Sequence, residues 1–132
     1  MTAQLGNVGE LQLVHTGLVC RDMEVAKPRL ADMLNVRWVG DEREDWPLTV
    51  YGKPVSLNLR IAHASNDQAN FELIKAVPDT PWVTSQAIIQ HHFCFYSPDS
   101  EAACKELENN GFERVLGRAG DPQGYFQDPE GL

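Results

Sequence analysis

The chain has 132 residues and a mass of 14.8 kDa, the size of one domain that can bury a core of its own. Its composition, 42% hydrophobic and 23% charged, is that of a globular protein and argues against collagen, coiled coil and disorder. Nineteen acidic residues against eleven basic ones give a net charge of −8. This charge argues against binding nucleic acid through its phosphates.

The first residues lack the basic start and apolar run of a signal peptide, and no apolar stretch is long enough to span a membrane. We therefore expect a cytoplasmic protein without membrane contact. The cysteines Cys20, Cys94 and Cys104 show no C-x-x-C spacing. We expect reduced, buried thiols rather than a disulfide framework or a cysteine zinc site.

The first elements are predicted as a strand over residues 13–20 and a helix through MEVAKPRLADML. Asp22 is the expected N-cap of this helix, whose apolar residues recur at i, i+4 and i+8 and predict a face that packs on a sheet. Pro28 fits a helix only in the first turn. We therefore expect a late start, near Glu24, or a kink.

Three more strands are expected before residue 78, separated by polar segments. The acidic run 41–46 is predicted to be a solvated loop, or a lid that carries a general base such as Glu42 or Glu44. Residues 65–69 are predicted to be a turn. Four apolar, β-branched segments account for these three strands: VRWVG and LTVYG, on either side of the acidic run, are counted together, and VSLNLRIA and FELIKAV follow.

The second half of the chain repeats this pattern. A strand over residues 91–97 precedes a helix over residues 101–110, with Asp99 or Ser100 as the cap and Gly111 as the stop. The segments ERVLG and GYFQ predict two strands, and DPEG predicts a turn. A strand equivalent to FELIKAV would fall beyond Leu132, so the second copy lacks its last strand.

An internal repeat supports this reading, because residues 15–40 align with residues 92–117 at seven of 26 positions. His15 aligns with His92. The sequence therefore predicts an α+β fold: one domain over residues 1–132, made of two βαβββ modules at about 11–78 and 88–132. Joined side by side, such modules form a curved mixed sheet with its helices on the outer face and a cleft on the other.

Strand alternation predicts which side chains share the cleft face. Phe93 and Phe95, like Phe71 and Leu73, are expected beneath the helices. His15, Glu72 and His92 are expected on the opposite face, where two imidazoles and a carboxylate suit a divalent Zn, Ni, Co, Mn or Fe ion. The alternative is a hydrogen-bonded strand histidine and a solvent-facing carboxylate.

Other polar residues are candidates for substrate binding. Cys94 and Tyr96 follow the parity of His92, and Arg60 is suited to a carboxylate or phosphate. The alternative for Asn58 and Arg60, and for Tyr125, is an exposed polar edge. His91 is expected to face away and His63 to be superficial.

The motifs VHTGLVCRDMEVA, FELIKAVPDTPW, HHFCFYSPD and GYFQDPEG together resemble the vicinal oxygen chelate superfamily of glyoxalases, bleomycin-resistance proteins, extradiol dioxygenases and methylmalonyl-CoA epimerases. The resemblance implies paired βαβββ modules and metal ligands from their first and last strands. The residues of this sequence that match these ligand positions are His15, Glu72 and His92. The family's fourth ligand, a Glu after DPEG, has no position in this sequence. The resemblance also implies a homodimer.

Two functions remain open. One is a divalent-metal-dependent lyase, isomerase or epimerase of the glyoxalase type, which acts on a small carbonyl or acyl substrate through an enolate-like intermediate. The alternative is a metal-free protein that sequesters a small molecule, as drug-resistance proteins do. We favour the enzyme, although neither the residue that moves the proton nor the substrate can be identified from the sequence.

Overall fold

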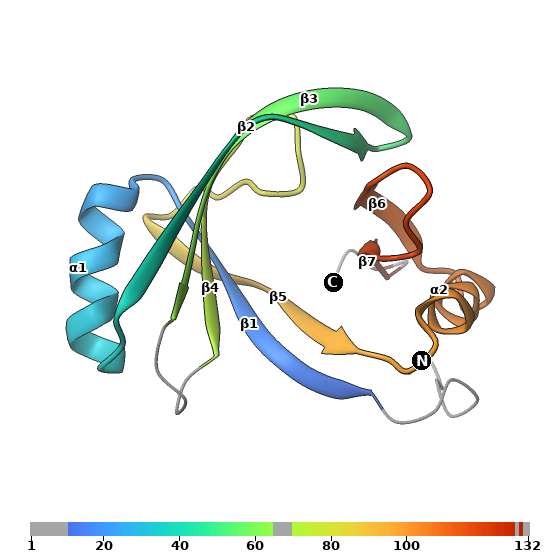
Figure 1. Cartoon of the computed structure of the whole chain (residues 1–132), viewed down its shortest axis with the longest axis horizontal. Helices are drawn as coiled ribbons and strands as arrows, with labels where there is room; N and C mark the ends of the chain where they lie inside the picture. The colour runs from blue at the N-terminus through green and yellow to red at the C-terminus, as the bar shows by residue number, and fades with distance from the viewer. Residues whose placement is uncertain (1–10, 65–69, 129, 131–132) are drawn as a thin grey trace. The chain divides into compact units, whose positions relative to one another are not determined.

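A computed structural model describes residues 11–64, 70–128 and 130. The fold is α+β, and the order of its elements is the predicted one: strand, helix and three strands, then strand, helix and two strands (Figure 1). The predicted turn at residues 65–69 lies outside the described residues. The elements are β1 Gln12–Cys20, α1 Met23–Leu34, β2 Trp38–Val50, β3 Lys53–Ala64, β4 Phe71–Lys75, β5 Ile88–Tyr96, α2 Ser100–Asn109, β6 Glu113–Gly117 and β7 Gly124–Gln127.

The chain divides into two compact units, each described by itself. The first, which we call the histidine unit, contains Leu13–Trp46 and Leu57–Cys94. The second, the C-terminal unit, contains Pro47–Ser56 and the described chain from Phe95 onward. These units do not follow the boundaries of the two sequence modules, because β2 and β3 contribute to both. That the whole chain forms a single domain stays a prediction.

The histidine unit is a mixed sheet with the strand order β5-β1-β4-β3-β2. β1 pairs with β4 in parallel, and β3 pairs with β4 antiparallel. Helix α1 covers one face, where its buried residues pack on side chains of β1, β3 and β4 and form the core, as the alternation predicts. The buried members of this core are Leu18, Cys20, Met23, Ala26, Leu30, Ala62 and Leu73.

Helix α1 begins one turn earlier than Pro28 requires. Asp22 is the N-cap, as predicted, and its carboxylate accepts the backbone N–H of Glu24 at 2.9 Å. The helix begins at Met23, one residue from the expected Glu24, but Pro28 then lies in the second turn rather than the first. Pro28 has no N–H to donate to the carbonyl of Glu24. The helix ends at Asn35, whose φ of 52° is left-handed.

The acidic run 41–46 is part of β2, so its prediction as a loop is wrong. Contacts with β3 hold it: Glu42 pairs with Arg60 at 3.1 Å, and the Asp45 N–H donates to Asn58 at 2.9 Å. Asp45 has a φ of 49°, which marks a local irregularity in an otherwise extended strand. Contacts with β3 thus hold the run in the sheet, although the side chains of Glu42, Glu44 and Asp45 remain exposed.

In the C-terminal unit, β6 pairs antiparallel with β7 and with the end of β2. Helix α2 has Asp99 as its N-cap and is followed by Gly111 at a φ of 86°, which agrees with the predicted cap and stop. Arg114 donates to the carbonyls of Asp121 and Gln123, each at 2.7 Å, and so holds the turn between β6 and β7.

Among the described residues, no helix is long and apolar enough to cross a membrane.

The aromatic residues of β5 differ from the prediction. Phe93 and Phe95 were expected beneath helices, but they are 57% and 52% exposed. β5 ends the strand order and therefore has a neighbouring strand on one side only. Side chains of such a strand are less completely covered than those of β1 and β4.

Candidate metal centre

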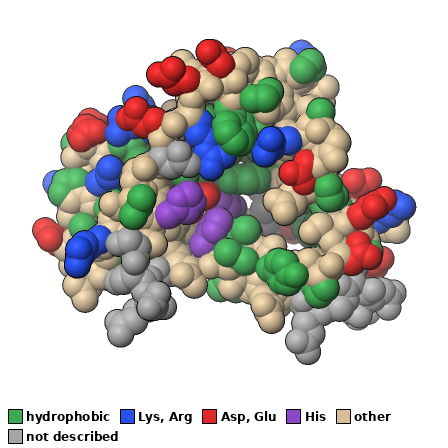
Figure 2. Space-filling view, viewed as in Figure 1, with side chains coloured by type: hydrophobic (Ala, Val, Ile, Leu, Met, Phe, Trp, Pro, Cys, Tyr) green, Lys and Arg blue, Asp and Glu red, His purple; other side chains and the backbone are tan. Residues whose placement is uncertain are grey.

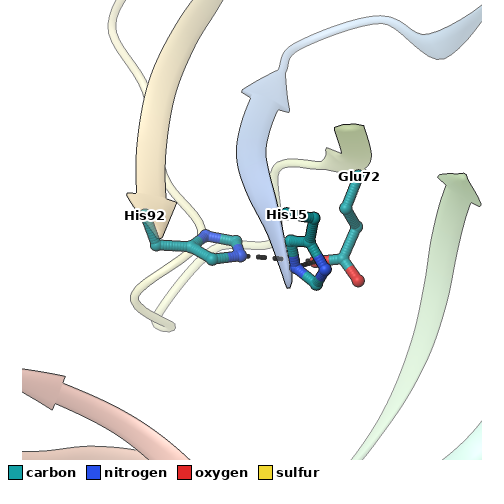
Figure 3. Close-up of side chains that lie close together, drawn as sticks. All are labelled: His15, Glu72 and His92. Carbon is teal, nitrogen blue, oxygen red and sulfur yellow. Dashed lines mark ion pairs between the residues drawn. The ribbon is translucent and has the colours of Figure 1, made fainter. Parts of the chain in front are cut away.

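Three neighbouring strands bring His15, Glu72 and His92 together on the sheet face opposite α1 (Figure 3). His15 lies on β1, Glu72 on β4 and His92 on β5. Gly17 is the register partner of Glu72, so the carboxylate lies across from a position two residues beyond His15 on the same face. In Figure 2 histidine side chains gather at one place on the surface.

The distances within this cluster suit a metal ion. Glu72 Oε1 lies 3.4 Å from His15 Nε2 and 3.3 Å from His92 Nε2. One donor atom from each residue can be chosen so that all three lie within 4.8 Å of one another. Two donor atoms that bind the same tetrahedral ion, each about 2.1 Å from it, lie about 3.4 Å from one another. The side chains therefore fit a divalent cation with little movement.

The electrostatics of the site favour an ionised carboxylate. The Glu72 side chain is only 12% exposed, and this burial by itself would raise its pKa. Hydrogen bonds and charge from His15 and His92 outweigh burial and hold the pKa of Glu72 well below its ordinary value. Glu72 thus presents a negative charge to any cation held between the two imidazoles.

His63 is a fourth member of the cluster, a contact that its prediction as a superficial residue did not include. It is the register partner of Glu72 on β3, and its Nε2 lies 3.0 Å from Glu72 Oε2. The side chain is 45% exposed. Its ring centroid is 6.4 Å from that of His15. Residue parity along β3 would have placed it on this face, had the pairing of β3 with β4 been known.

The absence of a side chain at Gly17 leaves the space that the His92 ring occupies. A Cβ built at Gly17 would overlap the imidazole ring of His92, so the ring lies directly against the backbone of β1. No residue with a side chain fits between His92 and this strand. The sequence signal was a glycine two positions after His15, on the face where the ligands meet.

His91 does not simply face away from its neighbour. Its Nδ1 lies 2.8 Å from Nδ1 of His92, and its Nε2 lies 2.6 Å from the carbonyl oxygen of Pro81. Burial lowers the pKa of His91, although the carbonyl of Pro81 opposes this shift and the charge of His92 adds to it. His91 is therefore biased toward the neutral imidazole.

Asn58 and Arg60 lie away from the cluster, so the structure contradicts their expected place on its face. Both share the strand parity of Ala62, which packs in the core beneath α1. Arg60 pairs with Glu24 of that helix at 3.2 Å and with Glu42 at 3.1 Å. Its charge is engaged on the helix side.

The remaining predicted residues differ in where they lie. Cys94 is half-buried in the histidine unit and lies two residues after His92 on β5, with the same strand parity. Burial and then the charge of Glu72 raise its pKa. Tyr96 and Tyr125 belong to the C-terminal unit, and their role in substrate binding stays a prediction. Glu130 is exposed, and its N–H donates to Asp128, as expected of a turn residue.

Comparisons with known proteins identify the family of this chain. No curated protein matches the chain significantly. A family model, described as the Glyoxalase/Bleomycin resistance protein/Dioxygenase superfamily, matches residues 14–126 and so includes all four histidines and Glu72. With this match over most of its length, the chain belongs to the Glyoxalase/Bleomycin resistance protein/Dioxygenase superfamily.

Proposed function

We propose that the chain is a divalent-metal-dependent enzyme that acts as a lyase, isomerase or epimerase on a small carbonyl or acyl substrate. The observation that carries this proposal is the convergence of two imidazoles and one carboxylate from three strands, with donor atoms within 4.8 Å. Membership of the superfamily supports it further. Membership alone does not identify the reaction, since one fold supports many activities.

His15, Glu72 and His92 would hold the metal. Imidazole and carboxylate donors suit Zn, Ni, Co, Mn or Fe, and three protein ligands leave positions for oxygen atoms of water or substrate. When bound, such a cation acts as a Lewis acid and stabilises negative charge that develops on a substrate oxygen. The fourth ligand seen elsewhere in the family is not needed for that role.

The protein's own residues prepare the site in three ways. His15 and His92 are 17% and 14% exposed, so their surroundings exclude most of the solvent. Glu72 supplies a charge of opposite sign to a cation. His63 holds the second oxygen of Glu72 and thereby leaves Oε1 directed between the two other imidazoles.

Metal analysis tests the proposal directly. Protein purified without a chelating tag is incubated with Zn, Ni, Co, Mn and Fe in turn, freed of excess metal and measured by elemental analysis. We expect about one ion per chain and its loss in the His15→Ala/His92→Ala double variant. Glu72→Gln should also lose metal, whereas Glu130→Gln, which changes an exposed carboxylate in a turn, should retain it.

The activity has its own test. The metal-loaded protein is incubated in D₂O with a panel of small carbonyl and acyl compounds, and deuterium at the carbon beside the carbonyl is followed by NMR. Wild type should incorporate deuterium into a subset of the panel, and the double variant should not. No metal uptake with any of the five ions, together with tight binding of an unchanged small molecule, would favour the metal-free sequestration function.

A further inference from the structure

A chain of contacts connects the backbone at Pro81 to the candidate metal centre. It runs from the Pro81 carbonyl oxygen to His91 Nε2 at 2.6 Å, and from His91 Nδ1 to His92 Nδ1 at 2.8 Å. The two rings are nearly perpendicular, at 86°, with centroids 5.1 Å apart. The other nitrogen of His92, Nε2, lies 3.3 Å from Glu72 Oε1.

The direction of each hydrogen bond follows from what the groups can donate. A carbonyl oxygen only accepts, so the hydrogen between His91 and Pro81 belongs to His91 Nε2. A neutral imidazole carries one N–H, which leaves Nδ1 of His91 as an acceptor. The hydrogen between the two rings then belongs to His92 Nδ1. Because Nδ1 is occupied by the contact with His91, Nε2 is the His92 nitrogen that can bind a metal, and it lies next to Glu72.

We propose that His91 is a positioning residue that fixes the ring orientation and tautomer of His92, so that Nε2 of His92 faces the metal. This inference rests on the proposed metal site and extends it beyond the three ligands. Metal-binding histidines generally donate their second N–H to a carboxylate, a backbone carbonyl or water. Here a second imidazole, itself anchored to a backbone carbonyl, takes that place.

The position of His91 in the strand explains why the arrangement is unusual. Side chains of consecutive strand residues generally point to opposite faces, so adjacent histidines do not ordinarily meet. His91 is held at both of its nitrogens, because the Pro81 carbonyl in the segment before β5 contacts Nε2 and His92 contacts Nδ1. Gly17 restricts the ring of His92 from the other side. Contacts with Gly17 and with His91 thus restrict the His92 ring from two sides.

NMR of the metal-free wild-type protein tests the hydrogen-bond directions without any metal. Long-range ¹H–¹⁵N spectra report which ring nitrogens carry hydrogen, and single histidine substitutions assign the signals. We expect a hydrogen on Nε2 and a bare Nδ1 in His91, and a hydrogen on Nδ1 in His92. A hydrogen on Nδ1 of His91 would overturn the inference even if the wild-type protein binds metal well.

Three variants separate positioning from simple structural support. His91→Asn keeps an acceptor oxygen near the position of Nδ1, where it can still contact His92. His91→Gln places its amide near the position of Nε2, closer to the Pro81 carbonyl. His91→Phe keeps a ring without either bond. We expect zinc affinity close to that of wild type for the Asn variant, and about 10–100-fold weaker binding for Gln and Phe.

The outcomes distinguish this inference from the proposed function. Wild-type zinc affinity in His91→Phe would overturn the positioning role, as would affinities that only follow the melting temperatures of the variants. A wild-type protein that binds no zinc or other tested ion would instead overturn the metal site itself. Should a variant fail to fold, the spectra of the wild-type protein still decide the hydrogen-bond directions.

Discussion

The imidazole of His92 lies against the backbone of Gly17, in space that no other residue would leave open. A Cβ at this position would meet three atoms of the ring. Gly17→Ala should therefore displace His92 and weaken metal binding by roughly tenfold or more, because a ligand moved by a methyl group no longer matches the other two. Competition with a chromophoric chelator measures this affinity.

Gly40→Ala is the matched control for this prediction. A Cβ at Gly40 meets only Lys27 Nζ, at 3.7 Å, which is an ordinary contact. The control variant should bind metal as wild type does. Equal affinities in the Gly17 and Gly40 variants would show that the position of His92 does not decide metal binding.

Removal of the His63 imidazole should weaken the site without abolishing it. His63 Nε2 is 3.0 Å from Glu72 Oε2, the oxygen that does not contact His15 or His92 in the ion pairs described. His63→Ala should lower metal affinity about tenfold, as loss of a supporting contact does, whereas the double variant of His15 and His92 should lose the metal. His63→Gln, whose amide can donate to Glu72, should recover part of the affinity. Complete metal loss in His63→Ala would identify His63 as a ligand.

The Cys20 thiol should react slowly in the folded protein. Burial, with the charge of Asp22, raises the pKa of Cys20 from 9.0 to about 11, and its side chain is fully buried. The thiolate is the reactive form, so at pH 8 Cys20 should be alkylated at least about 100-fold more slowly than a free thiol. Mass spectrometry after iodoacetamide treatment measures this rate, and unfolding in guanidinium provides the control. Rapid labelling of native Cys20 would contradict its burial.

The same shift predicts the sign of a pH effect on stability. The folded state holds the Cys20 proton more tightly than the unfolded chain does, so unfolding releases it above pH 9. The contribution is fully present below that pH and is lost as the pH rises toward about 11. Cys20→Ala should therefore lose less stability than wild type between pH 8 and pH 10 when both are unfolded with urea.

The convergence of His15, Glu72 and His92 could be predicted because strand alternation and the repeat act together. The repeat aligned His15 with His92, and parity on the strand of Glu72 put its carboxylate on the same face. His63 was missed because its contact depends on how β3 aligns with β4, and a sequence alone does not fix the register of neighbouring strands. Arg60 was misplaced because parity was counted without knowing that Ala62 packs beneath α1.

The other errors came from inferring structure from local composition alone. The run of residues 41–46 was predicted to be a loop because acidic residues are common in loops. It is part of a strand, and its contacts with Arg60 and Asn58 hold it against β3. Phe93 and Phe95 looked like core because they are aromatic, yet β5 lies at the end of the strand order. In both cases tertiary contacts decided the outcome, and local composition does not report them.

Pro28 offers a test of how α1 is stabilised. It is exposed, lies in the second turn and cannot donate to the carbonyl of Glu24. Pro28→Ala should restore that hydrogen bond and raise the free energy of unfolding by about 1–2 kcal/mol, since proline costs about 3 kcal/mol in a helix interior and regains up to about 1 kcal/mol by restricting the unfolded chain. Urea unfolding followed by circular dichroism measures the change, and Arg29→Ala, also exposed, should alter it by less than about 0.5 kcal/mol. A less stable Pro28→Ala variant would mean that the ring of Pro28 contributes contacts that outweigh the missing bond.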